Sequence, residues 1–181
     1  MNRKTFLTQI GGAGLLTMLP LSSMIASNKF DHNSDKDINE KIVLNKEGKI
    51  LNVIGDIQTH KLLGSDTNNQ IVEWVNEVEP GTGIPPHIHT REDEIFRVIK
   101  GQVEIMVGNK TVILNEGDMA YAPKNIVHSW KIVGDKKASM CTSAFPAGIE
   151  IMFNELNELP EGPPNFEIVA KICAKYGIRF V

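Results

Sequence analysis

The chain has 181 residues, of which 41% are hydrophobic and 23% are charged, a composition typical of one soluble globular domain. Its formal net charge is −3, and it becomes more negative by two if a leader carrying Arg3 and Lys4 is removed. A mildly acidic domain does not attract nucleic acid or an anionic lipid surface electrostatically, so we expect neither as a partner.

Residues 1–27 have the features of a secretory signal peptide: two basic residues, a Gly- and Leu-rich apolar run, and small residues at the end. A transmembrane anchor is the alternative, but polar residues, glycines and Pro20 interrupt the apolar run. The start also resembles a twin-arginine signal with lysine in the second place. We expect cleavage near Ala26 or Ser27, a polar linker over 28–40, and a periplasmic or secreted mature protein without a stable membrane anchor.

After the linker, the pattern is one of many short strands separated by turn signals. The candidate strands are 42–44, 50–54, 71–78, 95–99, 103–107, 112–114, 119–122, 126–133 and 139–145. Such a series predicts an all-β sandwich or barrel, which we place at residues 41–146.

A possible metal site lies between Gly81 and Gly101, where the chain reads GTGIPPHIHTREDEIFRVIKG. Side chains at i and i+2 of a strand share one face, so His87 and His89 can lean toward the same ion. Glu94 opens the next apolar run, and a short turn could bring its carboxylate back to that ion. Imidazole nitrogens with one carboxylate suit Fe, Mn, Ni, Cu or Zn rather than Mg or Ca.

A second segment follows after a 15-residue gap, with Gly117, Pro123 and His128. His128 lies 34 residues beyond Glu94, so only tertiary folding, such as a sheet that closes on itself, can bring the two together. We therefore predict that one divalent transition metal ion is bound by the following four residues: His87, His89, Glu94 and His128.

The two segments, 81–101 and 117–132, resemble the two signature motifs of the cupin superfamily. The matching positions are Gly81, His87, His89, Glu94, Gly101, Gly117, Pro123 and His128. The second motif departs from the family at Asn125 and Ile132, and asparagine should still make the left-handed turn that glycine usually makes there. The resemblance implies a double-stranded β-helix (jelly-roll) barrel. It also favours Glu94 as the ligand over the neighbouring Glu92 and Asp93.

The C-terminal segment 147–181 is predicted to be a helical extension of the barrel. An apolar stripe with helical spacing runs through Ile149, Met152, Phe153 and Leu156. A second helix should be capped by Asn165 and ended by Gly177, with a stripe at Phe166, Val169, Ala170 and Cys173. We expect both stripes to be packing faces. Cys173 and Cys141 are either two separate buried thiols or a disulfide.

Strand periodicity also suggests what surrounds the metal. If Glu94 and His128 point into the barrel, so do the side chains two and four residues from them. These are Phe96 and Val98 on one strand, and Ile126 and Trp130 on the other. Phe96 and Trp130 are therefore candidates to wall a substrate pocket, or they simply fill the barrel.

The opposite face of one predicted strand is also apolar, at Ile95 and Ile99. It needs cover from a helix or from a second copy of the chain, which makes a homodimer possible. His32 and His60 have no such context and are interpreted as ordinary polar residues.

Four protein ligands on an octahedral metal leave two positions for an oxygen-rich small molecule, or for that molecule and dioxygen together. The resemblance extends to quercetinase-like cupin oxygenases. It implies a metal-dependent dioxygenase acting on a small enolic or phenolic molecule, with Glu94 as both ligand and catalytic base. With the predicted signal peptide, this would be an exported enzyme. The alternatives are a non-catalytic cupin that binds a metal or small ligand, and a metal-dependent isomerase or lyase.

Overall fold

The computed structural model describes residues 39–160 and 162–181, so the predicted signal peptide and most of the predicted linker lie outside the described residues. The strands are β1 (Lys49–Val53), β2 (Asp56–Leu62), β3 (Val72–Val78), β4 (Gly83–His89), β5 (Asp93–Lys100), β6 (Val103–Val107), β7 (Lys110–Leu114), β8 (Met119–Ala122), β9 (His128–Ile132), β10 (Ala138–Phe145) and β11 (Ile178–Phe180). The helices are the 3-10 helix η1 (Gly64–Asp66), α2 (Ile149–Asn157) and α3 (Phe166–Lys175).

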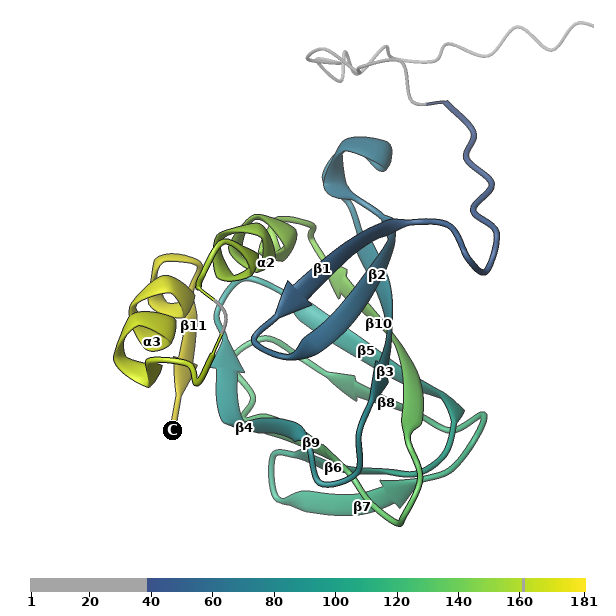
Figure 1. Cartoon of the computed structure of the whole chain (residues 1–181), viewed down its shortest axis with the longest axis vertical. Coiled ribbons are helices and arrows are strands. Elements are labelled where there is room, and N and C mark those ends of the chain that lie inside the picture. Colours follow the sequence, from purple (N-terminus) through teal and green to yellow (C-terminus); the bar gives the residue numbers. More distant parts are fainter. Residues whose placement is uncertain (1–38, 161) are drawn as a thin grey trace, which may run out of the picture. The chain divides into compact units, whose positions relative to one another are not determined.

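The strands form two antiparallel sheets (Figure 1). The six-stranded sheet has the order β1-β2-β3-β10-β5-β8, and the five-stranded sheet has the order β11-β4-β9-β6-β7. From β3 to β6, and again from β7 to β10, each strand belongs to the opposite sheet from the strand before it, so the chain winds around the space between the sheets. This is the predicted all-β jelly roll, and the predicted C-terminal helices are present.

The core lies between the sheets because buried and exposed side chains alternate along the strands. One buried cluster fills the interior of the barrel and includes Phe96, Ile105, Ile132 and Met140. Removing such side chains from water stabilises the fold by about 1.5–3 kcal/mol each.

A second buried cluster joins the helices to the six-stranded sheet. In Figure 1, α2 and α3 lie side by side, with α2 next to β1 and α3 next to β11. Phe153 of α2 meets Trp74 of β3 edge-on, with ring centroids 5.1 Å apart. Asn165 caps α3 as predicted, since its Oδ1 accepts hydrogen bonds from the backbone N–H groups of Glu167 and Ile168. The helices therefore close one side of the interior.

Several details of the sequence prediction were wrong, and strands β2 and β11 were not predicted. Residues 42–44 form no strand: Ile42 and Leu44 are 87% and 62% exposed, because no neighbouring strand pairs with them. Ile126 precedes β9 and is 39% exposed rather than inside the barrel. Phe166 and Ala170, expected on a packing face of α3, are both exposed, Phe166 by 77%, and Ile172 is buried in the core instead.

The predictions about the two cysteines and about a homodimer have different outcomes. The thiols of Cys141 and Cys173 are not bonded to each other. Ile99, on the outer face of β5, is 44% exposed, and the helices pack elsewhere. The homodimer that could cover this face stays a prediction. No helix among the described residues has the length and apolar character needed to cross a membrane.

The hairpin between β1 and β2 contains a strained residue. Ile54 and Gly55 form its two-residue turn, with φ of +57° and +89°. Such a turn favours Asn-Gly, and the left-handed region costs a side chain other than glycine about 1–2 kcal/mol. A β-branched residue there is an outlier, so some other demand must keep isoleucine at this position.

We expect Ile54→Asn to stabilise the fold by about 1 kcal/mol, since asparagine accepts the left-handed backbone. The melting temperature should rise by about 3–5 °C. Ile57→Asn is the matched control, because Ile57 is similarly exposed at 46% but lies in the regular part of β2. Thermal melts of both variants provide the measurement. An unchanged or lowered midpoint for Ile54→Asn would show that the turn is not strained.

Candidate metal centre

The four predicted ligands come together in the interior, from both sheets. His87 and His89 lie on β4, and His128 lies directly opposite His87 on the paired strand β9. Glu94 reaches the same point from β5 in the other sheet. One donor atom from each residue lies within 4.8 Å of the others, and all four side chains are buried.

The hydrogen bonds of the imidazoles leave their Nε2 atoms for the centre. His87 Nδ1 lies 2.9 Å from the carbonyl oxygen of Pro85, and His128 Nδ1 lies 3.0 Å from that of Ile126. A carbonyl can only accept, so Nδ1 carries the proton in both rings, and Nε2 of a neutral His87 keeps its lone pair. His128 Nε2 faces the Glu94 carboxylate and donates to it, and a bound ion would take the place of that proton. Metal-binding histidines are typically oriented in this way.

Glu94 is the electrostatic partner of this cluster. Its Oε2 lies 2.9 Å from His128 Nε2 and 3.5 Å from His89 Nε2. Burial alone would raise the pKa of Glu94, but the attraction of His89 and the hydrogen bond from His128 outweigh it and lower that pKa. Burial and the nearby His128 and His89 lower the pKa of His87 to about 4. The carboxylate is therefore ionised and His87 is neutral at pH 7, as metal ligands must be.

The donor set fits a divalent transition metal. Around an ion with bonds of about 2.1 Å, neighbouring donors lie about 3 Å apart and opposite donors about 4.2 Å apart, which agrees with a cluster no wider than 4.8 Å. Three imidazoles and a carboxylate match Fe, Mn, Ni, Cu or Zn. The buried His/Glu cluster thus has the composition and spacing of a metal site.

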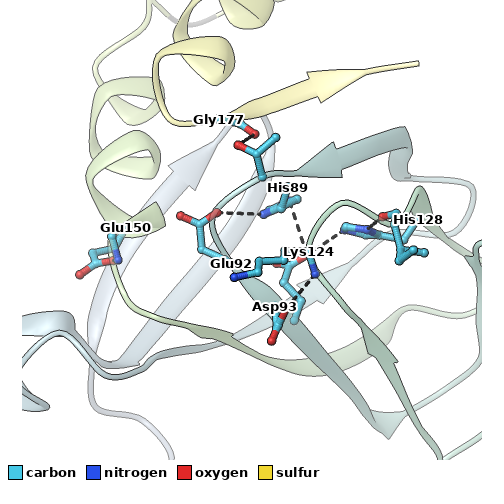
Figure 2. Close-up of polar contacts among 11 residues, drawn as sticks. His89, Glu92, Asp93, Lys124, His128, Glu150 and Gly177 are labelled. Carbon is cyan, nitrogen blue, oxygen red and sulfur yellow. Dashed lines mark hydrogen bonds and ion pairs between the residues drawn. The ribbon is translucent and has the colours of Figure 1, made fainter.

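Glu92, which the motif spacing excluded as a ligand, is not among the four grouped side chains. Its Oε2 lies 3.6 Å from His89 Nδ1 (Figure 2), whereas Glu94 faces the other ring nitrogen, Nε2. Both atoms are buried and neither has a hydrogen-bond partner, since 3.6 Å is longer than a hydrogen bond. Burial would lower the pKa of His89, but Glu94 and Glu92 together raise it. Glu92 therefore faces His89 across from Glu94 and attracts its ring electrostatically, a contact that sequence reasoning missed.

Asp93, the other rejected candidate, points away from the cluster and holds the loop before β9. Its carboxylate accepts hydrogen bonds from the backbone N–H of Lys124 at 2.8 Å and from the hydroxyl of Tyr121 at 3.1 Å. The next residue, Asn125, donates its N–H to the carbonyl oxygen of His89 at 2.7 Å. The loop that leads to His128 is thereby tied to the strand that carries His89.

Comparisons with known proteins agree with this arrangement. Residues 74–145 match the profile of a family described as the cupin domain. The chain resembles a solved RmlC-like cupin from Shewanella frigidimarina with a TM-score of 0.54 and 16% identity, over 62% of this chain and 96% of that one. The chain belongs to the cupin superfamily.

Curated relatives of this cupin include oxygen-using enzymes. It is 27% identical to quercetin 2,3-dioxygenase of Bacillus subtilis over 107 residues, which is 58% of this chain and 32% of that enzyme. It is 30% identical to oxalate oxidase GF-2.8 of Triticum aestivum over 117 residues, or 54% of this chain and 52% of that one. The chain thus matches between a third and about half of the length of these two relatives.

The turns of the cupin motifs adopt the backbone that the sequence predicted. Gly101 has φ of +82°, and a Cβ there would lie 2.9 Å from Ala138, so no larger residue fits without displacement. Asn125, in the place where cupins usually have glycine, has φ of +65°, which confirms that asparagine makes this turn. Pro85 and Pro86 are exposed and lie where the register of β4 shifts, as prolines in a sheet require.

A cavity of about 610 Å³ adjoins the His/Glu cluster of this cupin. His87, His89 and Glu94 line one part of it, next to Phe96 and Trp130. Both aromatic side chains are almost fully buried, at 2% and 7% exposure, and also belong to the barrel core. Their predicted contact with substrate stays a prediction, and their position beside the cluster is as the periodicity suggested.

The C-terminal helices supply much of the remaining wall, which the sequence analysis assigned to packing alone. The residues from this part of the chain are Ile149, Met152, Phe153, Leu156, Pro164, Phe166, Val169, Ala170, Cys173, Ile178, Phe180 and Val181. Nearly all are apolar, so the cavity suits the apolar body of a small molecule. Its size is within the range of sites for drug-sized ligands.

We expect the purified wild-type protein to bind about one transition-metal ion per chain, and His89→Ala to lose most of it, because one of four donors is removed. His60→Gln is the control, since His60 is a buried histidine outside the cluster. Elemental analysis after reconstitution measures the content. Equal metal in wild type and His89→Ala would contradict the assignment.

At a hundred times its Kd, the ion should also stabilise the wild type by about 2.7 kcal/mol, detectable in melts with and without chelator.

Proposed function

We propose that this cupin is a metal-dependent oxygenase that acts on a small enolic or phenolic molecule. The observation that carries the proposal is the position of the His/Glu cluster beside an apolar cavity of about 610 Å³. A site that only holds a structural metal is closed by its own ligands, whereas four ligands on a six-coordinate ion leave room for substrate. The similarity to an oxygenase and an oxidase supports the same reaction class.

The chain's own residues would divide the work as follows. Phe96 and Trp130 hold the flat body of the substrate and exclude water from the cluster. Glu94 takes the proton of the enol or phenol hydroxyl, leaving an oxyanion next to the three imidazoles. Its Oε1 receives that proton, because Oε2 already faces His128 and His89. Glu92 attracts the ring of His89 electrostatically from the Nδ1 side.

A bound divalent metal would stabilise the substrate oxyanion as a Lewis acid and bring the substrate and dioxygen together. Dioxygen is then the oxidant, and both of its atoms enter the product. The proposal therefore predicts oxygen consumption that depends on both metal and substrate.

The test is oxygen uptake by protein loaded separately with Fe, Mn, Ni, Cu or Zn, on a panel of phenols, catechols and 1,3-diketones. Glu94→Gln, checked for retained metal, should lower turnover by at least about 100-fold, as loss of a catalytic base does. Glu104→Gln is the control, because Glu104 is exposed on β6. Conversion without oxygen uptake would replace the proposal with an isomerase or lyase. Metal-dependent binding without conversion of any compound would replace it with a binding protein.

We also propose that the protein is exported, on the grounds of the basic start, apolar run and small residues of 1–27. The mature chain should begin after Ala26 or Ser27. N-terminal sequencing of protein purified from the periplasm or medium of the native cell measures this, and an intact Met1 in that fraction would contradict it.

A further inference from the structure

The cavity has a second polar region in addition to the metal cluster. Where β1, β2 and β3 line it, the side chains are Val53, Ile54, Asp56, Gln58, Trp74 and Asn76. Three of them, Asp56, Gln58 and Asn76, are polar and at most 6% exposed. A polar group in a largely apolar cavity is costly unless it has a partner, so this region requires an explanation.

Asp56 is the centre of that polar group. Its Oδ2 accepts a hydrogen bond from Gln58 Nε2 at 2.9 Å, and its Oδ1 accepts one from Asn76 Nδ2 at 3.0 Å. No lysine, arginine or histidine forms an ion pair with it within residues 39–160 and 162–181. The two amides therefore fix the orientation of a buried carboxyl group without supplying a counter-charge.

This group has more acceptors than donors. Each carboxylate oxygen can accept two hydrogen bonds, so the two amides leave part of the capacity of Asp56 unused. Asn76 Oδ1 is buried and receives no donor, and His60 Nδ1, next along the chain of hydrogen bonds, is also unpartnered. Burial raises the pKa of Asp56, against the opposing effect of Gln58 and Asn76. A ligand that brings a donor would relieve this deficit.

The strained residue Ile54 belongs to the same hairpin and lines the same cavity. It is 39% exposed, so packing in the core does not account for it. Strained residues typically persist where function requires the side chain they present. An apolar side chain at the rim of an apolar cavity is suited to cover the body of a ligand.

We propose that the β1–β2 hairpin selects the substrate: Asp56, held by Gln58 and Asn76, accepts a hydrogen bond from a hydroxyl or protonated amine of the substrate, and Ile54 covers its apolar body. The substrate then carries its enol or phenol at one place and a separate hydrogen-bond donor at another, with an apolar segment between them. This inference rests on the proposed function, because the enol or phenol must sit at the metal cluster.

The test measures binding by calorimetry under argon with Zn²⁺-loaded protein. The probes are catechols with an alkyl chain of graded length that ends in a hydroxyl, an ammonium or a methyl group. Without a partner, a buried hydroxyl or ammonium is unfavourable, so the methyl probes should bind best. If Asp56 accepts the donor, a hydroxyl or ammonium probe of at least one length should instead bind at least tenfold tighter than its methyl counterpart. Comparison of the hydroxyl probes with the ammonium probes shows whether charge or hydrogen bonding contributes more to binding at Asp56.

Variants then assign the preference to the hairpin. Asp56→Asn should lose it, whereas Asp135→Asn, at an exposed turn, should keep it. Ile54→Asn should weaken methyl and donor probes alike by several-fold. A methyl preference at every length in the wild type, or an unchanged donor preference in a folded Asp56→Asn, would overturn the inference while leaving the oxygenase proposal intact. The comparison of donor and methyl probes on the wild-type protein tests the inference even if Asp56→Asn does not fold. Absence of any Zn²⁺-dependent catechol binding would also overturn the inference, while the oxygen-uptake panel decides the proposed function separately.

Discussion

The site depends on one electrostatic interaction across the barrel: the carboxylate of Glu94, from one sheet, faces three imidazoles from the other. A buried carboxylate without partners is strongly unfavourable, and so is a set of buried imidazoles with lone pairs turned toward one another. Both are acceptors, so a proton or a cation between them relieves both, and it can do so only when the two sheets close to the observed distance, with Glu94 Oε2 2.9 Å from His128 Nε2. An ion bound between them would strengthen this closure, so metal binding and folding of the barrel should be linked.

The residues around the cluster support it in two layers, the first in contact with the four side chains and the second enclosing the cavity. Backbone carbonyls turn the rings of His87 and His128, Glu92 supports His89, and Asp93 holds the loop that leads to His128. Beyond them, apolar side chains of the barrel and the C-terminal helices enclose a cavity. Three successive carboxyl residues of one turn thus have three different roles, set by where the start of β5 points each of them.

The fold class and the four cluster residues could be predicted because their signal is local. A spacing of two residues on a strand places His87 and His89 together, and the cupin motifs add Glu94 and His128. Strand β2 was missed because its inward positions are polar: Asp56, Gln58 and His60 face the interior while Ile57 faces out, which reverses the usual pattern. The role of the helices as a cavity wall also has no local signal, since a helical stripe looks the same against a core or a cavity.

The central claim is that these four side chains bind one metal ion together. X-ray absorption spectroscopy of the reconstituted protein at the metal edge tests it most directly, because it reports the atoms bound to the ion. The account predicts a shell of nitrogen and oxygen at about 2.0–2.2 Å, with the outer-shell scattering of about three imidazoles. A shell containing sulfur from Cys141 or Cys173, or one without imidazole scattering, would contradict it.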